Sequence, residues 1–344
     1  MKILVTGGTG YIGSHTVVEL QQTGFTVVII DNLSNSSIEV LDAITAITGT
    51  RPLFEQFDLA DPNLTADFFA RHNDLSAVIH FAALKAVGES VAAPLRYYRN
   101  NLDSLLNILQ GMNDQHIRNL VFSSSCTVYG NPDRLPVDED APVKKAVSPY
   151  GNTKQISEEI IMDFGKVSDL QAILLRYFNP IGAHESALIG ELPIGEPSNL
   201  MPYITQTAAG LRPVLRVWGN DYHTPDGTAI RDYIHVVDLA RAHVIALERM
   251  MKSRMEESVE IFNLGTGTGY SVLDVIRSFE KVSGVRLKYQ FSDRRAGDVE
   301  KVWADPKRAH EILKWEAKQT LDEMTLSAWK WEQALSMHKR KDGS

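Results

Sequence analysis

The chain has 344 residues, of which 44% are hydrophobic and 23% charged, and its formal net charge is -8 at pH 7. This composition is typical of a folded globular protein and excludes a disordered or fibrous chain. The negative charge argues against nucleic acid or an anionic membrane surface as a partner. A length above the ~100–200 residues of one domain predicts two domains or one enlarged α/β domain.

Cys126 is the single cysteine of the chain. One cysteine excludes an internal disulfide and a cysteine-rich zinc site, and it is typical of a reducing compartment. The apolar run at the amino terminus is too short for a signal-peptide core, and no stretch approaches the ~18 apolar residues of a membrane span. No spacing of His, Asp or Glu suits a metal centre. We therefore expect a cytoplasmic protein without a metal.

Short apolar runs alternate with helical segments along the first two thirds of the chain. A strand over 2–6 stops at a glycine turn, and a helix over 11–20 follows it. Further strands are expected over 27–30, 77–81, 120–124, 172–176 and 260–264. Such alternation predicts an α/β fold whose parallel sheet is doubly wound with right-handed crossovers.

Residues 179–231 are richer in glycine, proline and polar side chains than the segments around them. We interpret this stretch as part of a smaller, discontinuous C-terminal substrate domain that also includes 265–344. The remaining segments, 1–178 and 232–264, then form the sheet domain.

Three glycines, Gly7, Gly10 and Gly13, form a G-x-x-G-x-x-G motif between the first strand and the first helix. The first allows a tight turn, the second lets a pyrophosphate approach the backbone, and the third lets helix and sheet pack closely. The following helix offers unpaired N–H groups and its positive dipole end. The motif is typical of a Rossmann-type dinucleotide site.

Asp31 closes the second strand roughly 20 residues past the glycines, where a carboxylate binds both ribose hydroxyls and repels a 2′-phosphate. The sequence therefore predicts NAD rather than NADP as the cofactor. Asp58 follows a third apolar run and can meet the adenine edge. An aspartate that begins a loop is equally expected on structural grounds, so both interpretations of Asp58 stay open.

Ser148 and the proline after it predict the start of a helix that carries Tyr150 and Lys154 on one face. A nearby ammonium lowers the pKa of a phenol from its usual value of about 10, so Tyr150 can act as a general base. Ser125 ends a strand at the sheet edge where ligands bind, and its hydroxyl can contact both Tyr150 and a substrate hydroxyl. The two serines before Ser125 are expected only to satisfy backbone groups.

Seven segments carry a resemblance to a known family. They are 6–13 (TGGTGYIG), 80–90 (HFAALKAVGES), 123–130 (SSSCTVYG), 148–154 (SPYGNTK), 175–180 (LRYFNP), 199–203 (NLMPY) and 231–235 (RDYIH). Together they resemble the UDP-glucose 4-epimerase family of extended short-chain dehydrogenases/reductases. The match runs from Met1 to about Trp331, and the segments around Lys85 and Asn199 are the most specific.

The resemblance implies an isomerase with tightly bound NAD that interconverts UDP-galactose and UDP-glucose through a transient 4-keto sugar. It also implies a UDP-hexose substrate and a homodimer formed through two helices of each subunit. Ser125 and Tyr150 would flank the reacting hydroxyl, and Lys154 would hold the nicotinamide ribose.

The family's cofactor positions add to the glycines and Asp31 the residues Tyr11, Ile12, Asn32, Asp58, Leu59, Phe81, Lys85, Asn100, Tyr150, Lys154 and Tyr177. Its sugar-nucleotide positions are Lys85, Ser125, Tyr150, Asn179, Asn199, Leu200, Leu215, Trp218, Arg231, Tyr233, Arg295, Asp298 and Val302. An acidic protein must concentrate cations to bind two phosphates, and Arg231 and Arg295 suit this task. For Arg294 a surface ion pair is expected instead.

Related activities on the same scaffold are the main alternatives. Nucleotide-sugar 4,6-dehydratases resemble this sequence but carry an acidic pair before Val-Tyr-Gly, where Cys126 and Thr127 stand here. A UDP-glucuronate decarboxylase is expected to have glutamate in place of Thr127. A non-catalytic NAD-binding regulator would keep the glycines without turning over UDP-galactose.

Val302 lies at the position that, by resemblance, forms a gate beside the substituent at carbon 2 of the hexose. A small residue there predicts a side activity on UDP-N-acetylglucosamine and UDP-N-acetylgalactosamine. Alternatively, Val302 packs a strand and another side chain closes the pocket.

Overall fold

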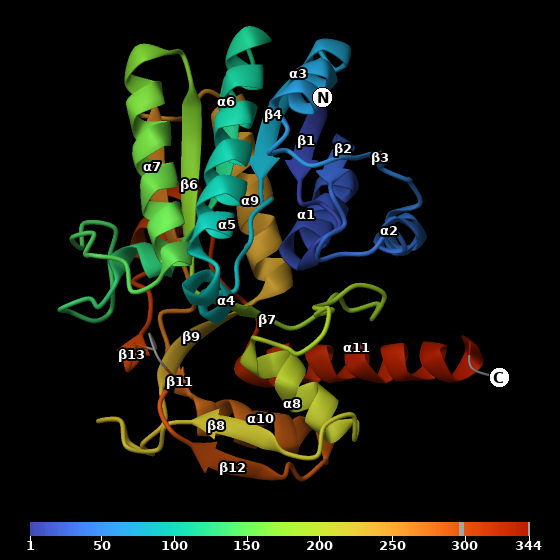
Figure 1. Ribbon diagram of the computed structural model, residues 1–344, viewed down its shortest axis with the longest axis vertical. Helices are drawn as coiled ribbons and strands as arrows, with labels where there is room; N and C mark the ends of the chain where they lie inside the picture. The colour runs from blue at the N-terminus through green and yellow to red at the C-terminus, as the bar shows by residue number, and fades with distance from the viewer. Residues whose placement is uncertain (296–298, 343–344) are drawn as a thin grey trace.

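The computed structural model describes residues 1–295 and 299–342, with side chains up to residue 337. Its larger part is a seven-stranded parallel sheet with the strand order β10-β6-β5-β4-β1-β2-β3 (Figure 1). The strands are β1 Lys2–Thr6, β2 Thr26–Asp31, β3 Leu53–Gln56, β4 Leu75–His80, β5 Asn119–Ser125, β6 Gln171–Tyr177 and β10 Val259–Leu264. The predicted Rossmann-type fold and all these strands except β3 are confirmed.

The apolar run before Asp58 was not predicted to be a strand because it is short and interrupted by polar residues; the structure shows it as β3. Glu55 and Gln56 follow its two apolar residues, and Leu53 is half exposed at the edge of the sheet. The strand is held by its pairing with β2, which sequence periodicity does not report. From β1 the chain winds out to β2 and β3, and it then returns to β4 on the other side of β1. This reversal creates the switch point at which such sheets bind ligands.

Helices cover both faces of this sheet (Figure 1). One face carries α1 Tyr11–Gln22, α2 Val40–Thr48 and α9 Val236–Met251, and the other carries α3 Pro62–Arg71, α6 Ser104–Asp114 and α7 Pro149–Val167. Shorter segments are α4 Val87–Ala92, α5 Pro94–Tyr98, the π-helix η1 Arg99–Asp103 and the 3-10 helix η2 Cys126–Tyr129.

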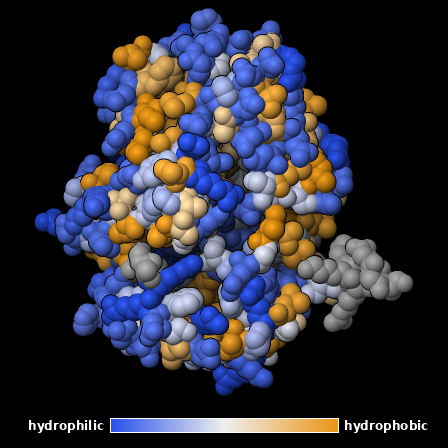
Figure 2. Space-filling model, viewed as in Figure 1, coloured by the Kyte–Doolittle hydropathy of each residue, from blue (hydrophilic) through white to orange (hydrophobic). Residues whose placement is uncertain are grey.

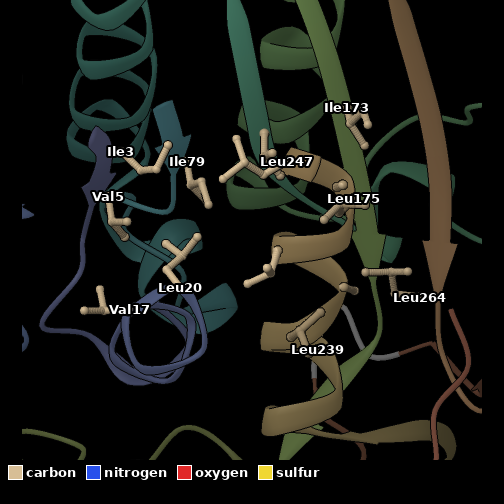
Figure 3. Packing of buried hydrophobic residues seen from close by; sticks show 14 of the residues in the cluster. Ile3, Val5, Val17, Leu20, Ile79, Ile173, Leu175, Leu239, Leu247 and Leu264 are labelled. Carbon is tan, nitrogen blue, oxygen red and sulfur yellow. The ribbon is translucent and has the colours of Figure 1, made fainter. Parts of the chain in front are cut away.

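Alternate residues of each strand enter different cores, as the two-residue period of a strand requires. Ile3 and Val5 of β1 pack with side chains of α1 and α9, whereas Leu4 packs on the opposite side with the helices α3 and α6. Figure 3 shows Leu20 of α1 and Leu247 of α9 beside the strand residues of the first core. Burial on both faces explains why the strands are almost continuously apolar.

The smaller part lies below the carboxyl ends of the large sheet in Figure 1. It contains a four-stranded sheet in which β9 pairs with β7, β11 and β13, and a two-stranded sheet of β8 and β12. Its strands are β7 Asn179–Ile181, β8 Leu215–Trp218, β9 Ile230–His235, β11 Gly269–Ser271, β12 Tyr289–Ser292 and β13 Lys301–Val302. Its helices are α8 Leu200–Ala208, α10 Val272–Ser283 and α11 Leu321–Asp342, whereas the π-helix η3 Ala309–Leu313 packs against α9 and β10 of the larger part.

The predicted boundary between residues 231 and 232 falls inside β9. Because β9 pairs, among the described residues, only with strands of the smaller part, residues 232–235 belong to that sheet rather than to the large one. The two-domain division itself stays a prediction. Across the described residues, no helix is long and apolar enough to cross a membrane.

Candidate active site

A cavity of about 790 Å³ lies at the carboxyl ends of the sheet strands, where residues of both parts form its wall. Every predicted cofactor residue and all three predicted catalytic residues line it. From the predictions these are Gly7, Gly10, Tyr11, Ile12, Gly13, Asp31, Asn32, Asp58, Leu59, Phe81, Lys85, Asn100, Ser125, Tyr150, Lys154 and Tyr177, joined by Asn179, Asn199 and Arg295. The fold thus gathers residues that lie far apart in the sequence into one space.

The glycine loop has the geometry of a phosphate cradle. Gly7 adopts a φ of 70°, and a Cβ atom on Gly13 would lie 2.2 Å from the Gly7 carbonyl oxygen. By contrast, a Cβ on Gly10 would meet only that same oxygen, at 3.1 Å. Gly10 is also the N-cap of α1, so the first N–H groups of the helix face the cavity without a competing side-chain cap. These backbone features fit a dinucleotide pyrophosphate.

Asp31 is held at the end of β2 beside this loop. Its Oδ1 accepts hydrogen bonds from the Leu33 N–H and the Ser36 hydroxyl, both at 3.0 Å, and its Oδ2 accepts one from the Thr9 N–H at 3.3 Å. The carboxylate therefore fixes the loop and also lines the cavity where a ribose would lie. A ribose hydroxyl is a donor that suits this carboxylate, so the residues present fit NAD.

Asp58 combines the two interpretations that the sequence left open. Its Oδ1 accepts the Ala60 N–H at 2.9 Å, as expected of a residue that begins a loop. Its Oδ2 accepts a hydrogen bond from the side-chain amide of Asn32 at 3.2 Å, and both residues line the cavity. The pair closes the wall beyond the end of β2.

The predicted helix start at Ser148 is confirmed. The Ser148 hydroxyl accepts the Gly151 N–H at 3.1 Å, and α7 then begins at Pro149. This cap places Tyr150 in the first turn and Lys154 one turn later, and both line the cavity. Ser125, the last residue of β5, lies close enough to Tyr150 for its hydroxyl to favour the phenolate. The three predicted catalytic side chains are therefore together.

The expected lowering of the Tyr150 pKa by Lys154 was wrong for the chain by itself. Burial raises the pKa of Tyr150 to about 12, and the hydrogen bond from Ser125 opposes this only in part. Lys154 directs its ammonium to the Ser123 carbonyl, at 2.6 Å, rather than to the phenol. Burial also lowers the pKa of Lys154 to about 8, against the charge of Glu158, which raises it. Desolvation outweighs charge attraction here.

The two adjacent arginines, Arg294 and Arg295, have different surroundings. Arg294 forms an ion pair with Asp221 at 2.7 Å and stacks over the Tyr222 ring, so its surface ion pair is confirmed. Arg295 instead lines the cavity, where its Nη1 donates to the Ser198 carbonyl oxygen at 3.3 Å. Adjacent side chains thus point in different directions, and Arg295 is the one of the two placed to meet an anion.

Several predicted sugar-nucleotide residues lie outside the lining of this cavity in the described part of the chain: Leu200, Leu215, Trp218, Arg231, Tyr233 and Val302. Leu215 and Tyr233 are buried in the core of the smaller part, so their side chains serve packing. Val302 is 6% exposed and belongs to an apolar cluster with Val128 and Phe178. The binding roles of this set stay predictions, and Asp298 lies outside the described residues.

Glu191 is a cavity residue that the sequence reasoning missed. It lies in the loop between β7 and α8, and its carboxylate contacts Lys85 and Asn199. A lone acidic residue in a loop rich in glycine and proline carries no pattern that separates it from a solvated surface charge. Only the three-dimensional contacts identify it.

The glycine loop, Asp31 and the Tyr150–Lys154 pair in one cavity define an NAD-dependent enzyme of the extended short-chain dehydrogenase/reductase class. A sequence model described as GDP-mannose 4,6 dehydratase matches residues 4–327. The chain is 52% identical to UDP-glucose 4-epimerase of Bacillus subtilis, over 96% of this chain and 97% of that protein. It is 49% identical to UDP-glucose 4-epimerase of Mus musculus, over 96% of each chain.

Solved structures agree with these relatives. UDP-glucose-4-epimerase from Stenotrophomonas maltophila, crystallised with NAD and formylated UDP-arabinopyranose, has a TM-score of 0.94 and 50% identity over 98% of this chain and 99% of that one. UDP-glucose 4-epimerase from Bifidobacterium longum, in complex with NAD+ and UDP, has a TM-score of 0.93 and 45% identity, over 97% of this chain and 98% of that one. The chain therefore belongs to the family that the sequence model describes and, within it, to the UDP-glucose 4-epimerases. The predicted isomerase class and NAD cofactor are confirmed.

Proposed function

We propose that this chain interconverts UDP-galactose and UDP-glucose, with Ser125, Tyr150 and Lys154 as its catalytic residues. The observation that carries the proposal is the convergence of Tyr150, its partner Ser125 and the glycine loop on one cavity. When bound there, NAD supplies reversible hydride transfer at carbon 4 of the hexose. Because the same hydride returns to the sugar, the reaction involves no net oxidation.

Tyr150 moves the proton. Its phenol oxygen accepts the proton of the 4-hydroxyl as the hydride leaves, and it returns that proton when the ketone is reduced on the other face. Ser125 holds the reacting oxygen through its hydroxyl. Burial keeps the pKa of Tyr150 high in the chain alone, so the phenolate must be stabilised by positive charge when the cofactor is in place.

Lys154 is a cation of the same cavity wall, although in the chain alone its ammonium donates to the Ser123 carbonyl and not to the phenol. A pKa of about 8 keeps Lys154 largely protonated at neutral pH, and the negative charge of Glu158, one turn further along α7, supports that state. Lys154 is also positioned to bind ribose hydroxyls, because it lines the cavity and its ammonium has three donors.

The diphosphate requires local cations because the protein as a whole is negative. Lys85 and Arg295 line the cavity and can supply charge-assisted hydrogen bonds to phosphate oxygens. Burial raises the pKa of the Cys126 thiol in the cavity wall, and Arg231 is close enough for its charge to oppose that rise. We propose these three cations as the phosphate ligands.

Dehydration and decarboxylation are less well supported. Each needs a carboxylate of its own beside the reacting carbons, but Cys126 and Thr127 occupy the cavity wall at the positions concerned. Burial raises the pKa of the Cys126 thiol to about 12, so it is a poor proton acceptor at neutral pH. The epimerase proposal requires no further acid or base.

The test is an assay of the purified chain with UDP-galactose and no added cofactor. We expect UDP-glucose to form, and we expect enzymatic assay of the supernatant after denaturation to detect NAD(H). Bound NAD without turnover would instead support a non-catalytic regulator. Turnover that requires added NAD would contradict tight cofactor binding.

We propose in addition that two copies associate through the helices α4 to α7. α4, α5 and α7 contact one another, and the four helices expose Val91, Leu95, Leu106 and Val167. Figure 2 shows apolar side chains gathered over α6 and α7. Light scattering at micromolar concentration should give the mass of a dimer, and Leu95→Asp combined with Leu106→Asp should give a monomer. A monomeric parent chain would contradict the proposal.

A cytoplasmic location is proposed on narrower grounds, the single Cys126 thiol and its reducing-compartment signature. Fractionation of cells that express the chain tests it, and recovery mainly outside the cytoplasmic fraction would contradict it.

A further inference from the structure

One carboxylate oxygen joins the two sides of the cavity. Oε1 of Glu191 accepts a hydrogen bond from Lys85 Nζ at 3.1 Å and another from the Asn199 side-chain amide at 2.5 Å. Lys85 comes from the segment after β4 in the large sheet, whereas Asn199 immediately precedes α8 in the smaller part. Glu191 thus connects two residues that face the cavity from different parts of the molecule.

The second carboxylate oxygen of Glu191 lacks a hydrogen-bond donor among the described residues. Oε2 is buried and has no hydrogen-bond partner among the described residues, and the side chain as a whole is only 12% exposed. A buried carboxylate oxygen without a donor is unfavourable. A negative charge beside a site for an anionic diphosphate is unfavourable as well. Stability and general electrostatics therefore do not account for glutamate at this position.

The surrounding chain nevertheless fixes Glu191 in place. The Trp331 indole N–H donates to the Glu191 carbonyl oxygen at 3.0 Å, which ties the loop to α11. Gly190 lies against the same indole so closely that a Cβ there would be 2.6 Å from the ring. An isolated bridge between Ala183 and Gly190 closes the base of the loop. These backbone contacts fix the Glu191 carboxylate at the cavity wall.

We propose that Glu191 is a positioning residue that holds Lys85 and Asn199 in the arrangement that receives the sugar nucleotide. A lysine side chain is long and flexible, so an unrestrained Lys85 would have to be ordered each time substrate binds. Glu191 orders it beforehand and sets its distance from Asn199. This proposal rests on the substrate contacts of Lys85 and Asn199 in the proposed function.

A double-mutant cycle tests the proposal in the full-length, NAD-loaded enzyme. Glu191→Ala should raise KM for UDP-galactose on the order of tenfold, change kcat by less than about threefold, and leave the NAD content unchanged. If Glu191 acts in part through Lys85, the KM of the double variant Glu191→Ala/Lys85→Ala should rise by less than the product of the two single effects. The corresponding cycle with Asn199→Ala should also be non-additive. A merely structural carboxylate would not produce this coupling.

Glu185→Ala is the matched control, because Glu185 is an exposed acidic residue of the same loop and does not line the cavity. It should leave KM within twofold of the parent value. If Glu191→Ala does not fold, Glu191→Gln retains the shape, and the same cycles are measured with it. Additive changes in KM, or a loss confined to kcat, would overturn the proposal. Failure of the parent enzyme to convert UDP-galactose would instead overturn the proposed function.

Discussion

The cofactor side and the sugar-nucleotide side of the cavity are built in different ways. Every predicted cofactor residue lines the cavity, because parallel strands end at one edge of the sheet and their register brings Gly7, Asp31 and Phe81 to the same level. The sugar-nucleotide side is assembled from loops and strands of two to six residues, and part of the predicted set lies elsewhere. A motif locates a site reliably where regular structure carries it there.

Asp232 shows how the smaller part is joined together. This aspartate of the R-D-Y-I-H segment is fully buried, and it accepts backbone hydrogen bonds from Thr266 at 2.8 Å, Gly267 at 3.1 Å and Ala304 at 3.1 Å. It therefore connects three segments that are far apart in the sequence. In this segment the acidic residue builds the fold, whereas the binding role of Arg231 stays a prediction.

The largest expected effect is at the convergence point of the two sides. Tyr150→Phe removes the proton-transferring oxygen and leaves the ring, so turnover should fall by ~10²–10⁴. NAD should remain bound, because the glycine loop and Asp31 hold it. Ser125→Ala should cost less, since Ser125 only positions the hydroxyl. Steady-state assays combined with NAD content measure both effects, and near-normal turnover of Tyr150→Phe would exclude its role.

A substitution that damages only the cofactor side should remove the bound NAD, whereas Tyr150→Phe should retain it. In Gly13→Ala the new Cβ would overlap the Gly7 carbonyl oxygen, so the glycine loop must shift. The backbone N–H groups that bind the pyrophosphate are then displaced. We expect purified Gly13→Ala to lose most of its NAD, with activity falling in parallel. Gly24→Ala is not a suitable control because Gly24 has a φ of 90°. Ala43→Gly, at a position of α2 that does not line the cavity, tests whether exchange of one methyl group elsewhere spares the NAD content. Full retention of NAD by Gly13→Ala would contradict the assignment of the glycine loop as the pyrophosphate site.

These differences define what the sequence could predict. The glycine spacing, the Ser148 cap and the Tyr150–Lys154 pair are local patterns, and the structure places them as expected. The pKa of Tyr150 was mispredicted because burial depends on the whole fold. Glu191 was missed because its contacts with Lys85 and Asn199 span long sequence separations. What depended on periodicity or helix geometry was predictable, and what depended on tertiary packing was not.

On the sugar-nucleotide side, neighbouring arginines should differ sharply. Arg295→Ala removes a cation that lines the cavity, so KM for UDP-galactose should rise by about tenfold, the scale of a charge-assisted hydrogen bond. Arg294→Ala breaks only an exposed ion pair with Asp221, so KM should stay within about twofold. Equal effects of the two substitutions in parallel assays would show that Arg295 does not meet the phosphates.

The junction between the two parts should respond to acid. Burial lowers the pKa of His15 to about 3 and that of His235 to about 4, and the charges of the two imidazoles oppose each other. As the pH falls below about 6.5 the unfolded chain binds protons that these folded histidines exclude, so stability is lost between pH 6.5 and pH 4. Above pH 6.5 they make no contribution to pH dependence.

His235→Asn isolates this effect, because asparagine can still accept the Val237 N–H that His235 accepts at 3.1 Å. The variant's stability should fall with acid less steeply than the parent's, by up to ~1.4 kcal/mol per pH unit. Urea unfolding at pH 7, 6 and 5 measures the slopes. His116→Asn, at an exposed turn, is the control and should keep the parent's slope. Identical slopes for the parent and His235→Asn would disprove the assignment.

The smallest expected effect concerns which sugars fit. Val302 does not line the cavity, but it packs in the same apolar cluster as Phe178, which does. The size of Val302 can therefore affect the substrate through a shift of Phe178 or of Cys126, which packs on the same cluster and also lines the cavity. A hydrophobic pocket discriminates a few carbons by only ~1–3 kcal/mol. We expect measurable but slower conversion of UDP-N-acetylglucosamine by the parent enzyme.

Two substitutions separate a gate from simple packing. If Val302 sets the room available, Val302→Tyr should suppress the N-acetyl activity and spare UDP-galactose, while Val302→Ala should raise the ratio of N-acetyl to UDP-galactose activity a few-fold. If Val302 only fills the cluster, overpacking by tyrosine should lower the thermal midpoint and both activities together. No conversion of either N-acetylated substrate by the parent enzyme would show that the gate assignment is wrong. The sugar-nucleotide wall would then be set by side chains that the sequence motifs do not mark.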